Sequence, residues 1–333
     1  MNDHYHIYGI GAALVDTEIE VSDADLKAMA VAKGVMTLVD EPRQSELIDY
    51  LSDHLVHSNR ASGGSGANTV IAASYFGCRS FYSCRVANDE NGEFYLNDIK
   101  AAGVDYPEHL GSDEGITGKC LVMITPDAER SMNTFLGISA GLSVNELHTP
   151  AIDAADYVYI EGYLVSSDTG RAAAIELRER AEKRNTLTSL SLSDPAMVQF
   201  FRDGLLEMIG KGVDLLFCNR EEAMGFTGTN TLEEAAQSLQ DYCRSFAITC
   251  GADGALVFDG RHSYHIDAQP VKAVDTNGAG DMFAGAFLYA LSQGHGYDVA
   301  GRFASLAASK VVTQYGPRLR PEQHQELKQA FFG

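Results

Sequence analysis

The sequence predicts an α/β protein with a mostly parallel central sheet and helices on both faces. Two observations lead to this fold class. From residue 157 to residue 250, short apolar runs alternate with longer helical segments. Strands separated by helices of this length normally form a parallel sheet that is covered on both faces. The chain of 333 residues is also long enough to bury a large core, so we expect a single domain over residues 1–333.

The first predicted elements are a buried strand at residues 5–14 and a helix at residues 65–76, which Gly77 terminates. A strand at 79–83 and a helix ending at 101 follow. The later strands are expected at 157–161, 187–192, 215–218 and 245–250, and the later helices at 169–184, from 196, and at 220–225, 232–242, 279–291, 298–313 and 322–331. Ligands bind at the carboxyl ends of such strands, and Asp16, Asn219 and Thr249 fall at these ends.

Further strand-like segments predict a second, small sheet. Residues 17–21 alternate polar and apolar side chains, and the runs 119–125 and 130–135 are joined by a hairpin-type turn at 126–129. Together with residues 35–39 they can form a sheet apart from the main one. The alternative is that they are edge strands of the main sheet.

Composition narrows the classes of partner. The chain has 46 acidic and 25 basic residues and a formal net charge of −21, which argues against binding to nucleic acid or to an anionic membrane. We see no apolar run of signal-peptide type and no stretch of ~18 apolar residues, so the expected location is the cytoplasm. The six cysteines show no metal-ligand spacing, and buried free thiols are expected.

A glycine-rich turn opens the predicted helix at 279–291. Gly278, Ala279 and Gly280 let the backbone turn tightly, and the free amides of a helix N-terminus favour an anion. Asp281 stands in the first helical turn, where a carboxylate beside a bound phosphate can act as a general base. The alternative is a capped helix with an acidic residue in its first turn.

Two motifs resemble signatures of the ribokinase-like (PfkB) carbohydrate and nucleoside kinases. The segment 275–281, Asp-Thr-Asn-Gly-Ala-Gly-Asp, is similar to the C-terminal signature, and 63–68, Gly-Gly-Ser-Gly-Ala-Asn, is similar to the N-terminal one. The similarity extends over nearly the whole chain and is strongest with the adenosine-kinase-like branch. It implies a ribokinase-like fold in which the small sheet, formed by about 14–39 and 117–135, is a lid over the acceptor.

The resemblance assigns roles on the acceptor side. It implies that Asp16 binds two sugar hydroxyls, since a carboxylate can accept two O–H hydrogen bonds. It also implies acceptor contacts from the residues Leu14, Gly63, Gly64, Asn68, Tyr163 and, toward the transferred phosphate, Arg130. Asn68 could instead face solvent, and Arg130 could be a solvated charge. Ala12, Leu164 and Ala196 depart from the adenosine-kinase pattern, where a polar or aromatic residue is usual.

On the nucleotide side, the resemblance implies that Asp281 is the base and that the amides of Gly278, Ala279 and Gly280 stabilise the γ-phosphate. It assigns nucleotide contacts to Asn219, Glu222, Thr249, Gly251, Gly254 and Asn277, and it places Mg²⁺ near Glu222 through water. Asp275 would help hold a monovalent cation, K⁺, as in some members of the family. The local alternatives are an ordinary N-cap at Asn219 and a tight hairpin at 249–254.

The expected function is transfer of the γ-phosphate of ATP to a primary hydroxyl of a ribose-containing acceptor, either an adenosine-like nucleoside or a simple sugar. The alternative is a sensor that binds such ligands on a kinase fold without turnover. ATP, Mg²⁺ and one small-molecule acceptor are the expected partners. A monomer and a homodimer formed through the lid are both open.

Overall fold

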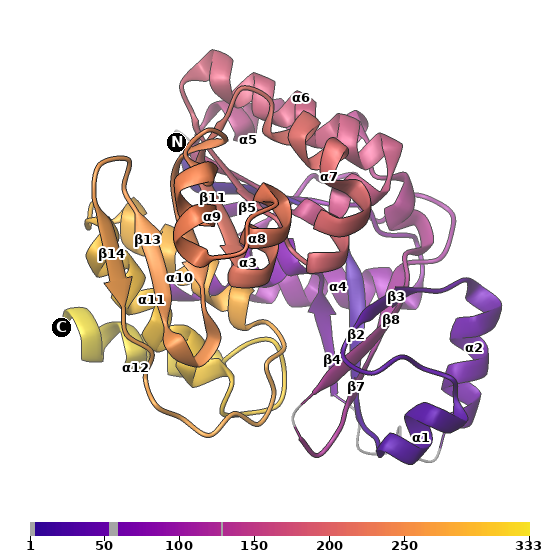
Figure 1. Ribbon diagram of the computed structural model, residues 1–333. Helices are drawn as coiled ribbons and strands as arrows, with labels where there is room; N and C mark the ends of the chain where they lie inside the picture. The colour runs from indigo at the N-terminus through magenta and orange to yellow at the C-terminus, as the bar shows by residue number, and fades with distance from the viewer. Residues whose placement is uncertain (1–3, 53–58, 128) are drawn as a thin grey trace.

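The computed structural model describes residues 4–52, 59–127 and 129–333. Within these residues the main sheet has nine strands in the order β14-β13-β12-β11-β10-β9-β1-β5-β6. Strands β14 and β13 form its edge at the left of the view in Figure 1. The seven strands from β12 to β6 run parallel, and β13 and β14 add an antiparallel edge. The strands are β1 Tyr5–Ile10, β5 Ser80–Ser83, β6 Val104–Asp105, β9 Ala155–Ile160, β10 Leu187–Ser191, β11 Val213–Asn219, β12 Cys243–Thr249, β13 Ala255–Phe258 and β14 Ser263–Ile266.

Helices cover both faces of this sheet, and neighbouring residues of β1 show the division: Ile7 packs in one apolar cluster and Tyr8 in the other. The first face carries α3 Ser65–Phe76, α4 Glu90–Ala101, α10 Ala279–Ser292, α11 Tyr297–Val311 and α12 Pro321–Phe332. The second carries α5 Thr149–Asp153, α6 Asp168–Arg184, α7 Pro195–Ile209, α8 Arg220–Thr227 and α9 Leu232–Leu239. This confirms the predicted fold class.

Helices α3 and α10 pack closely although the main part of the chain separates them. A Cβ atom added at Gly285 of α10 would lie 2.5 Å from the carbonyl oxygen of Thr69 in α3. No larger side chain fits there without moving backbone atoms, so the two helices meet almost backbone to backbone. This contact brings the N-termini of both helices to the same place.

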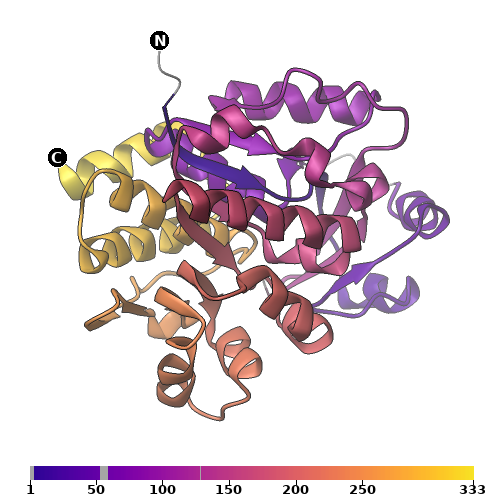
Figure 2. The same ribbon diagram turned by 90° about the horizontal axis from the view of Figure 1, so that it is seen from above.

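The second sheet has the order β3-β8-β7-β2-β4. Its strands are β2 Leu14–Glu20, β3 Met36–Leu38, β4 Asn59–Gly63, β7 Gly118–Ile124 and β8 Arg130–Phe135. Helices α1 Asp23–Ala28 and α2 Glu41–Tyr50 pack on its outer face against Ile19, Leu121 and Met123. Figure 2 shows this sheet at one side of the molecule and the C-terminal helix at the opposite side.

The predicted second sheet is confirmed, and its strands are not edge strands of the main sheet. The turn predicted at 126–129 includes residue 128, which lies outside the described residues. The predicted helix at 65–76 is found with the same bounds. The expected strand at 5–14 was wrong in its extent, because β1 ends at Ile10 and the chain crosses at residues 11–13 into β2. Short 3₁₀ helices at Gly137–Gly141, Val144–Glu146, Gly162–Ser166 and Gly251–Asp253 were not predicted.

Five cysteines are buried and Cys250 is half-buried, and all six are free thiols, as expected. Burial raises the pKa of Cys78, Cys243 and the other buried thiols. Among the helices of the described ranges, none combines the length and the apolar character that crossing a membrane requires.

Candidate active site

A cavity of about 390 Å³ lies between the carboxyl ends of the parallel strands and the second sheet. Fifteen of the predicted site positions line it: Leu14, Asp16, Gly64, Asn68, Arg130, Tyr163, Asn219, Glu222, Thr249, Gly251, Asn277, Gly278, Ala279, Gly280 and Asp281. Ser65 of the first glycine motif, which was not predicted as a site residue, lines it too. Gly63, Gly254 and Asp275 are not in its wall. Both glycine motifs therefore open into one space.

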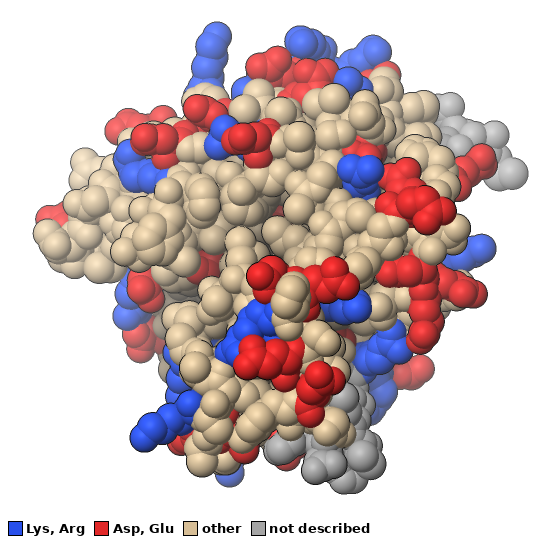
Figure 3. Space-filling view, turned by 90° about the vertical axis from the view of Figure 1, so that its right-hand side faces the viewer, with Lys and Arg blue, Asp and Glu red and all other residues tan. Residues whose placement is uncertain are grey.

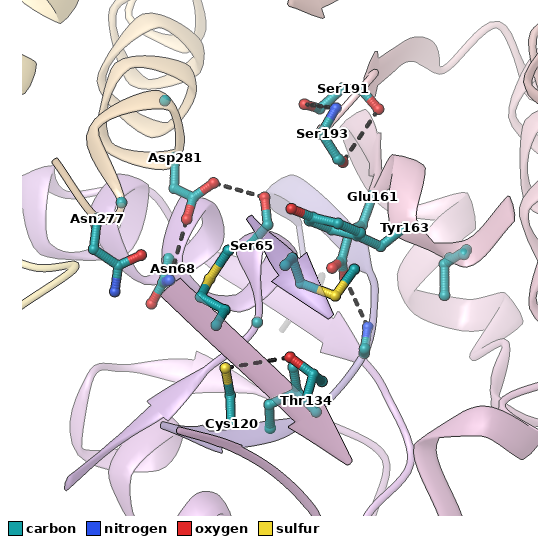
Figure 4. Close-up of a pocket in the computed structure, with 18 of the residues that line it drawn as sticks. Ser65, Asn68, Cys120, Thr134, Glu161, Tyr163, Ser191, Ser193, Asn277 and Asp281 are labelled. Carbon is teal, nitrogen blue, oxygen red and sulfur yellow. Dashed lines mark hydrogen bonds between the residues drawn. The ribbon is translucent and has the colours of Figure 1, made fainter. Parts of the chain in front are cut away.

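Asp281 joins the two motifs directly (Figure 4). Its Oδ1 accepts a hydrogen bond of 2.6 Å from Ser65 Oγ, and its Oδ2 accepts one of 3.1 Å from Asn68 Nδ2. Burial raises the pKa of Asp281, while these two hydrogen bonds and the charge of Arg130 lower it. A carboxylate with a raised pKa is better matched to proton transfer near neutral pH than an ordinary aspartate.

The turn that begins α10 has the geometry of an anion site. Gly278 has φ of +71°, and a Cβ there would meet the Pro317 carbonyl oxygen at 2.3 Å, so only glycine fits. The first helical hydrogen bond runs from Met282 N to Gly278 O, which leaves the amides of Gly280 and Asp281 without helical partners. The amide of Ala279 donates to Thr276 O at 3.3 Å, so it is less available than expected.

Asp275 supports this turn from behind. Its buried carboxylate accepts hydrogen bonds of 2.9 Å from the backbone amides of Asn277 and Gly316. The Val312 carbonyl accepts from the amides of Val274 and Asp275. These hydrogen bonds are made within the protein and do not test for an ion. The monovalent cation at Asp275 therefore stays a prediction.

Asp16 faces the cavity from β2. It is 6% exposed, and no described residue donates a hydrogen bond to its carboxylate. Burial, together with the charges of Glu18 and Asp281, raises its pKa to about 8, although the charge of Arg318 acts to lower it. A Cβ at Gly63 would lie 2.0 Å from Asp16 Cγ. Gly63 therefore acts by leaving room for the Asp16 carboxylate, and not as part of the cavity wall.

The N-terminus of α3 supplies the opposite wall. Gly64 has φ of +93°, and a Cβ there would meet the Ala12 carbonyl oxygen at 2.3 Å. Asn68 is 4% exposed, and its Oδ1 is buried without a hydrogen-bond partner in the described structure. An unpartnered amide oxygen at a cavity is available to a ligand hydroxyl.

Glu161, at the end of β9, is a buried cavity residue that the sequence analysis did not single out. Its Oε2 accepts a 2.7 Å hydrogen bond from Ala12 N, and burial raises its pKa to about 8. A Cβ at Gly11 would collide with this carboxylate at 1.8 Å. In the sequence, this site residue is marked by an acidic side chain directly after an apolar strand and by Gly11, whose missing side chain leaves room for that carboxylate.

Asn219 and Glu222 form a reciprocal cap at the start of α8. Asn219 N and Nδ2 donate to the two Glu222 oxygens at 2.9 and 2.7 Å, and Glu222 N donates to Asn219 Oδ1 at 2.8 Å. Burial raises the pKa of Glu222 to about 7. The arrangement is the N-cap that local reasoning allowed, and it also holds an acidic group at the cavity. A single carboxylate suits Mg²⁺, which keeps most of its water ligands.

The segment 249–254 is a tight hairpin turn between β12 and β13, in which Cys250 N donates to Gly254 O at 2.7 Å. Gly254 has φ of +89°, and a Cβ there would meet the Ile266 carbonyl at 1.9 Å. Gly254 is thus required by the backbone of the hairpin. Thr249 and Gly251 line the cavity, and their contact with nucleotide stays a prediction.

Arg130 extends from β8 toward the anion turn, where its Nη1 donates to Thr276 O at 2.7 Å. Tyr163 lies on another wall, and its hydroxyl donates to Asp194 Oδ2 at 3.3 Å. The second sheet and its flank add apolar side chains to the cavity wall, namely Leu14, Met36, Leu38, Met132 and Leu136. Figure 3 shows the face that carries the second sheet, where basic side chains are scattered among acidic ones.

The fold and the site together define a phosphotransferase of small molecules: a glycine-rich helix N-terminus that carries Asp281 faces the buried Asp16 carboxylate across one cavity. The chain belongs to the pfkB family of carbohydrate kinases, whose family model matches residues 33–324. These are kinases that use ATP and phosphorylate an alcohol group.

Relatives cover nearly the whole chain. Adenosine kinase 1 of Arabidopsis thaliana is 30% identical over 349 aligned residues, covering 95% of this chain and 96% of the relative. A ribokinase of Haemophilus influenzae is 29% identical over 273 residues, covering 80% and 86%. The crystal structure of an adenosine kinase from Sinorhizobium meliloti superposes with a TM-score of 0.91 at 31% identity, covering 98% and 99%. The predicted resemblance is thereby confirmed.

Proposed function

We propose that this protein transfers the γ-phosphate of ATP to the primary hydroxyl of a ribonucleoside. One observation carries the proposal: Asp16 presents a buried carboxylate, to which no described residue donates a hydrogen bond, to the same cavity into which the anion turn and Asp281 open. Burying such a group unpaired is costly. A vicinal diol, which donates two hydrogen bonds, would relieve that cost.

The acceptor hydroxyl would approach Asp281, which takes its proton as the hydroxyl oxygen attacks the γ-phosphorus. The bond from the γ-phosphorus to the bridging oxygen breaks, and ADP leaves. In the structure both oxygens of Asp281 accept hydrogen bonds, from Ser65 and Asn68. These donors hold the carboxylate in position and leave each oxygen a further lone pair for the incoming proton. The amides of Gly280 and Asp281, with the helix dipole, would stabilise the charge of the transferred group.

Glu222 and Asn219 would position Mg²⁺ through water, and the ion would supply neutralisation of the phosphate charge. This local supply of positive charge is needed in a chain with a formal charge of −21. Arg130 would add a cation next to the turn. In the structure its Nη1 donates a hydrogen bond to the Thr276 carbonyl oxygen, so the Arg130 guanidinium contacts the backbone at the edge of the anion site.

The cavity wall favours a nucleoside over a bare sugar. A bare sugar carries hydroxyl groups around its ring, and each would need a polar partner when buried. Here the second sheet presents apolar side chains, including Met36, Leu38 and Met132. Leu164 stands in the wall where the adenosine-kinase pattern has an aromatic residue, so the base would be held by apolar contact more than by stacking.

The test is a coupled assay of ADP formation with ATP, Mg²⁺ and a panel of nucleosides and sugars, with the product identified by mass spectrometry. We expect a 5′-phosphorylated ribonucleoside, and no product when EDTA removes Mg²⁺. Faster phosphorylation of free ribose or a hexose than of any nucleoside would reject the acceptor assignment. Binding of acceptor and ATP without turnover would instead support the sensor.

A further inference from the structure

Strand β2 carries a second buried carboxylate, which the proposed reaction does not use. Glu18 lies two residues after Asp16 and therefore on the same face of the strand. Like Asp16 it is 6% exposed. A Cβ at Gly316 would lie 3.5 Å from Glu18 Oε2. The carboxylate therefore lies beside Gly316, whose amide binds Asp275 behind the anion turn, and Glu18 is not part of the cavity wall.

Two buried polar atoms in this region lack hydrogen-bond partners among the described residues: Glu18 Oε1 and Asn277 Nδ2. One is an acceptor and the other a donor. The Asn277 amide lies beside the Glu18 carboxylate and lowers its pKa, although the two atoms do not reach hydrogen-bond geometry. Each unpartnered group costs free energy that a mutual hydrogen bond would recover.

Asn277 belongs to the anion turn itself. Asp275 binds its backbone amide, and Gly278 and Gly280 follow it. Moving the Asn277 side chain toward Glu18 would therefore fix the turn from the side of the second sheet. A second link already exists, because Arg130 of β8 donates to Thr276 O at 2.7 Å. The second sheet thus reaches the same turn from two of its strands.

We propose that Glu18 is a positioning residue that accepts a hydrogen bond from Asn277 Nδ2 once the Asn277 side chain moves toward it, and so holds the anion turn in the orientation that receives the phosphate. The consequence for the reaction rests on the proposed function. Asp16 and Glu18 lie on one strand and move together. Binding of the acceptor by the second sheet and completion of the anion site would therefore occur at the same time. Arg318, which lies near both carboxylates and lowers the pKa of each, favours their ionised forms.

The experiment compares Glu18→Ala, Glu18→Gln and Asn277→Ala with Glu20→Ala as the matched control. Glu20 is exposed, belongs to the same strand and lies on the same face. Amide hydrogen exchange of residues 275–281 is measured by mass spectrometry, together with kcat and KM. Glu18→Met, which keeps the side-chain volume without an acceptor, replaces the alanine variant if that variant does not fold.

Glu18→Ala and Asn277→Ala should speed amide hydrogen exchange of the turn. They should also lower kcat about tenfold or more, because each removes a hydrogen bond to a charged group. The double variant should be no worse than the worse single one. Glu18→Gln should retain most of kcat, because its amide oxygen can accept the same hydrogen bond, and Glu20→Ala should match the wild type. The proposal is overturned if the turn exchanges equally in Glu18→Ala and Glu20→Ala, or if the two losses add. Absence of turnover in the wild type would reject the proposed function alone, because hydrogen exchange still reports on the turn.

Discussion

Asn68 and Asp281 come from opposite ends of the chain and are joined by a 3.1 Å hydrogen bond from Asn68 Nδ2 to Asp281 Oδ2. The first residue is expected to bind the acceptor and the second to deprotonate it. Their contact means that the position of the acceptor and the position of the base depend on one another. Ser65 donates to the other oxygen of Asp281, so the carboxylate is held by hydrogen bonds at both of its oxygens.

Replacing Asp281 by Asn should leave the fold intact and lower kcat by ~10²-fold or more, because the amide cannot take the acceptor proton. Steady-state kinetics with the best acceptor of the panel, together with a thermal melt, would check both parts. Asp203→Asn, at an exposed position of α7, is the control and should retain activity. Turnover of Asp281→Asn close to that of the wild type would remove Asp281 from the mechanism.

Replacing Asp16 by Asn should stabilise the ligand-free protein in a pH-dependent way. Its folded pKa of about 8 exceeds the ordinary value of 3.8, so the protonated carboxyl is favoured by folding. Its contribution to stability is fully present below about pH 4 and is lost as the pH rises to about 8. Urea unfolding should therefore show an advantage of the variant that grows from pH 5 to pH 8, to at least about 1 kcal/mol.

The opposite sign is expected at Asp98, whose pKa is lowered: the salt bridge to Arg318 and hydrogen bonds from Ser62 outweigh its burial. Asp98→Asn should destabilise the protein near neutral pH, and this loss should shrink as the pH falls through the folded pKa. For Asp16, an Asn variant whose gain in stability does not change with pH would contradict the argument that burial raises the pKa of the Asp16 carboxyl.

The sugar hydroxyls should matter more than the base. Asp16 and Asn68 offer acceptors for a diol, and a site built to hydrogen-bond hydroxyls strongly rejects analogues that lack them. We expect loss of the 2′ or 3′ hydroxyl to lower kcat/KM by ~10²-fold or more, and a change of one group on the base by about tenfold. Kinetics on ribo-, deoxy- and base-altered nucleosides would decide this. A larger effect of the base would direct attention to Tyr163.

Two glycines should respond differently to alanine. At Gly63 the new methyl group would collide with the Asp16 carboxylate, whereas at Gly280 nothing lies within 4 Å. Gly63→Ala should raise the acceptor KM about tenfold or more. Gly280→Ala should keep or slightly raise the melting temperature, by the helix preference of alanine, while its methyl group at the anion site weakens use of ATP. Equal effects of both variants on acceptor and ATP would refute this division.

The sequence predicted the parts of the site that depend on local backbone chemistry. Gly278 and Asp281 lie within one short motif, and the helix at Ser65–Phe76 has a glycine at each end, so its bounds could be found without neighbours. The end of β1 at Ile10 could not be predicted in this way. The break there depends on the contact of Ala12 with Glu161, a residue 149 positions away.

Contacts between charged residues far apart in the chain could not be predicted from the sequence either. Glu18 appeared only as one polar residue in an alternating strand, and its burial follows from the approach of residues 275–277 and 316. The pairing of β2 with both β4 and β7 depends on segments separated by many residues. Register between such segments is set by packing, which a single sequence does not display.

The close packing of α3 against α10 at Gly285 has a consequence for synthesis of the protein. Helix α3 is translated early, but its partner is completed only when most of the chain has left the ribosome. During that interval apolar residues of α3, such as Val70 and Phe76, which are fully buried in the folded protein, lack part of their cover. The nascent chain therefore exposes an apolar helix face that a chaperone can bind, and truncated chains that end before α10 would retain this face and tend to aggregate.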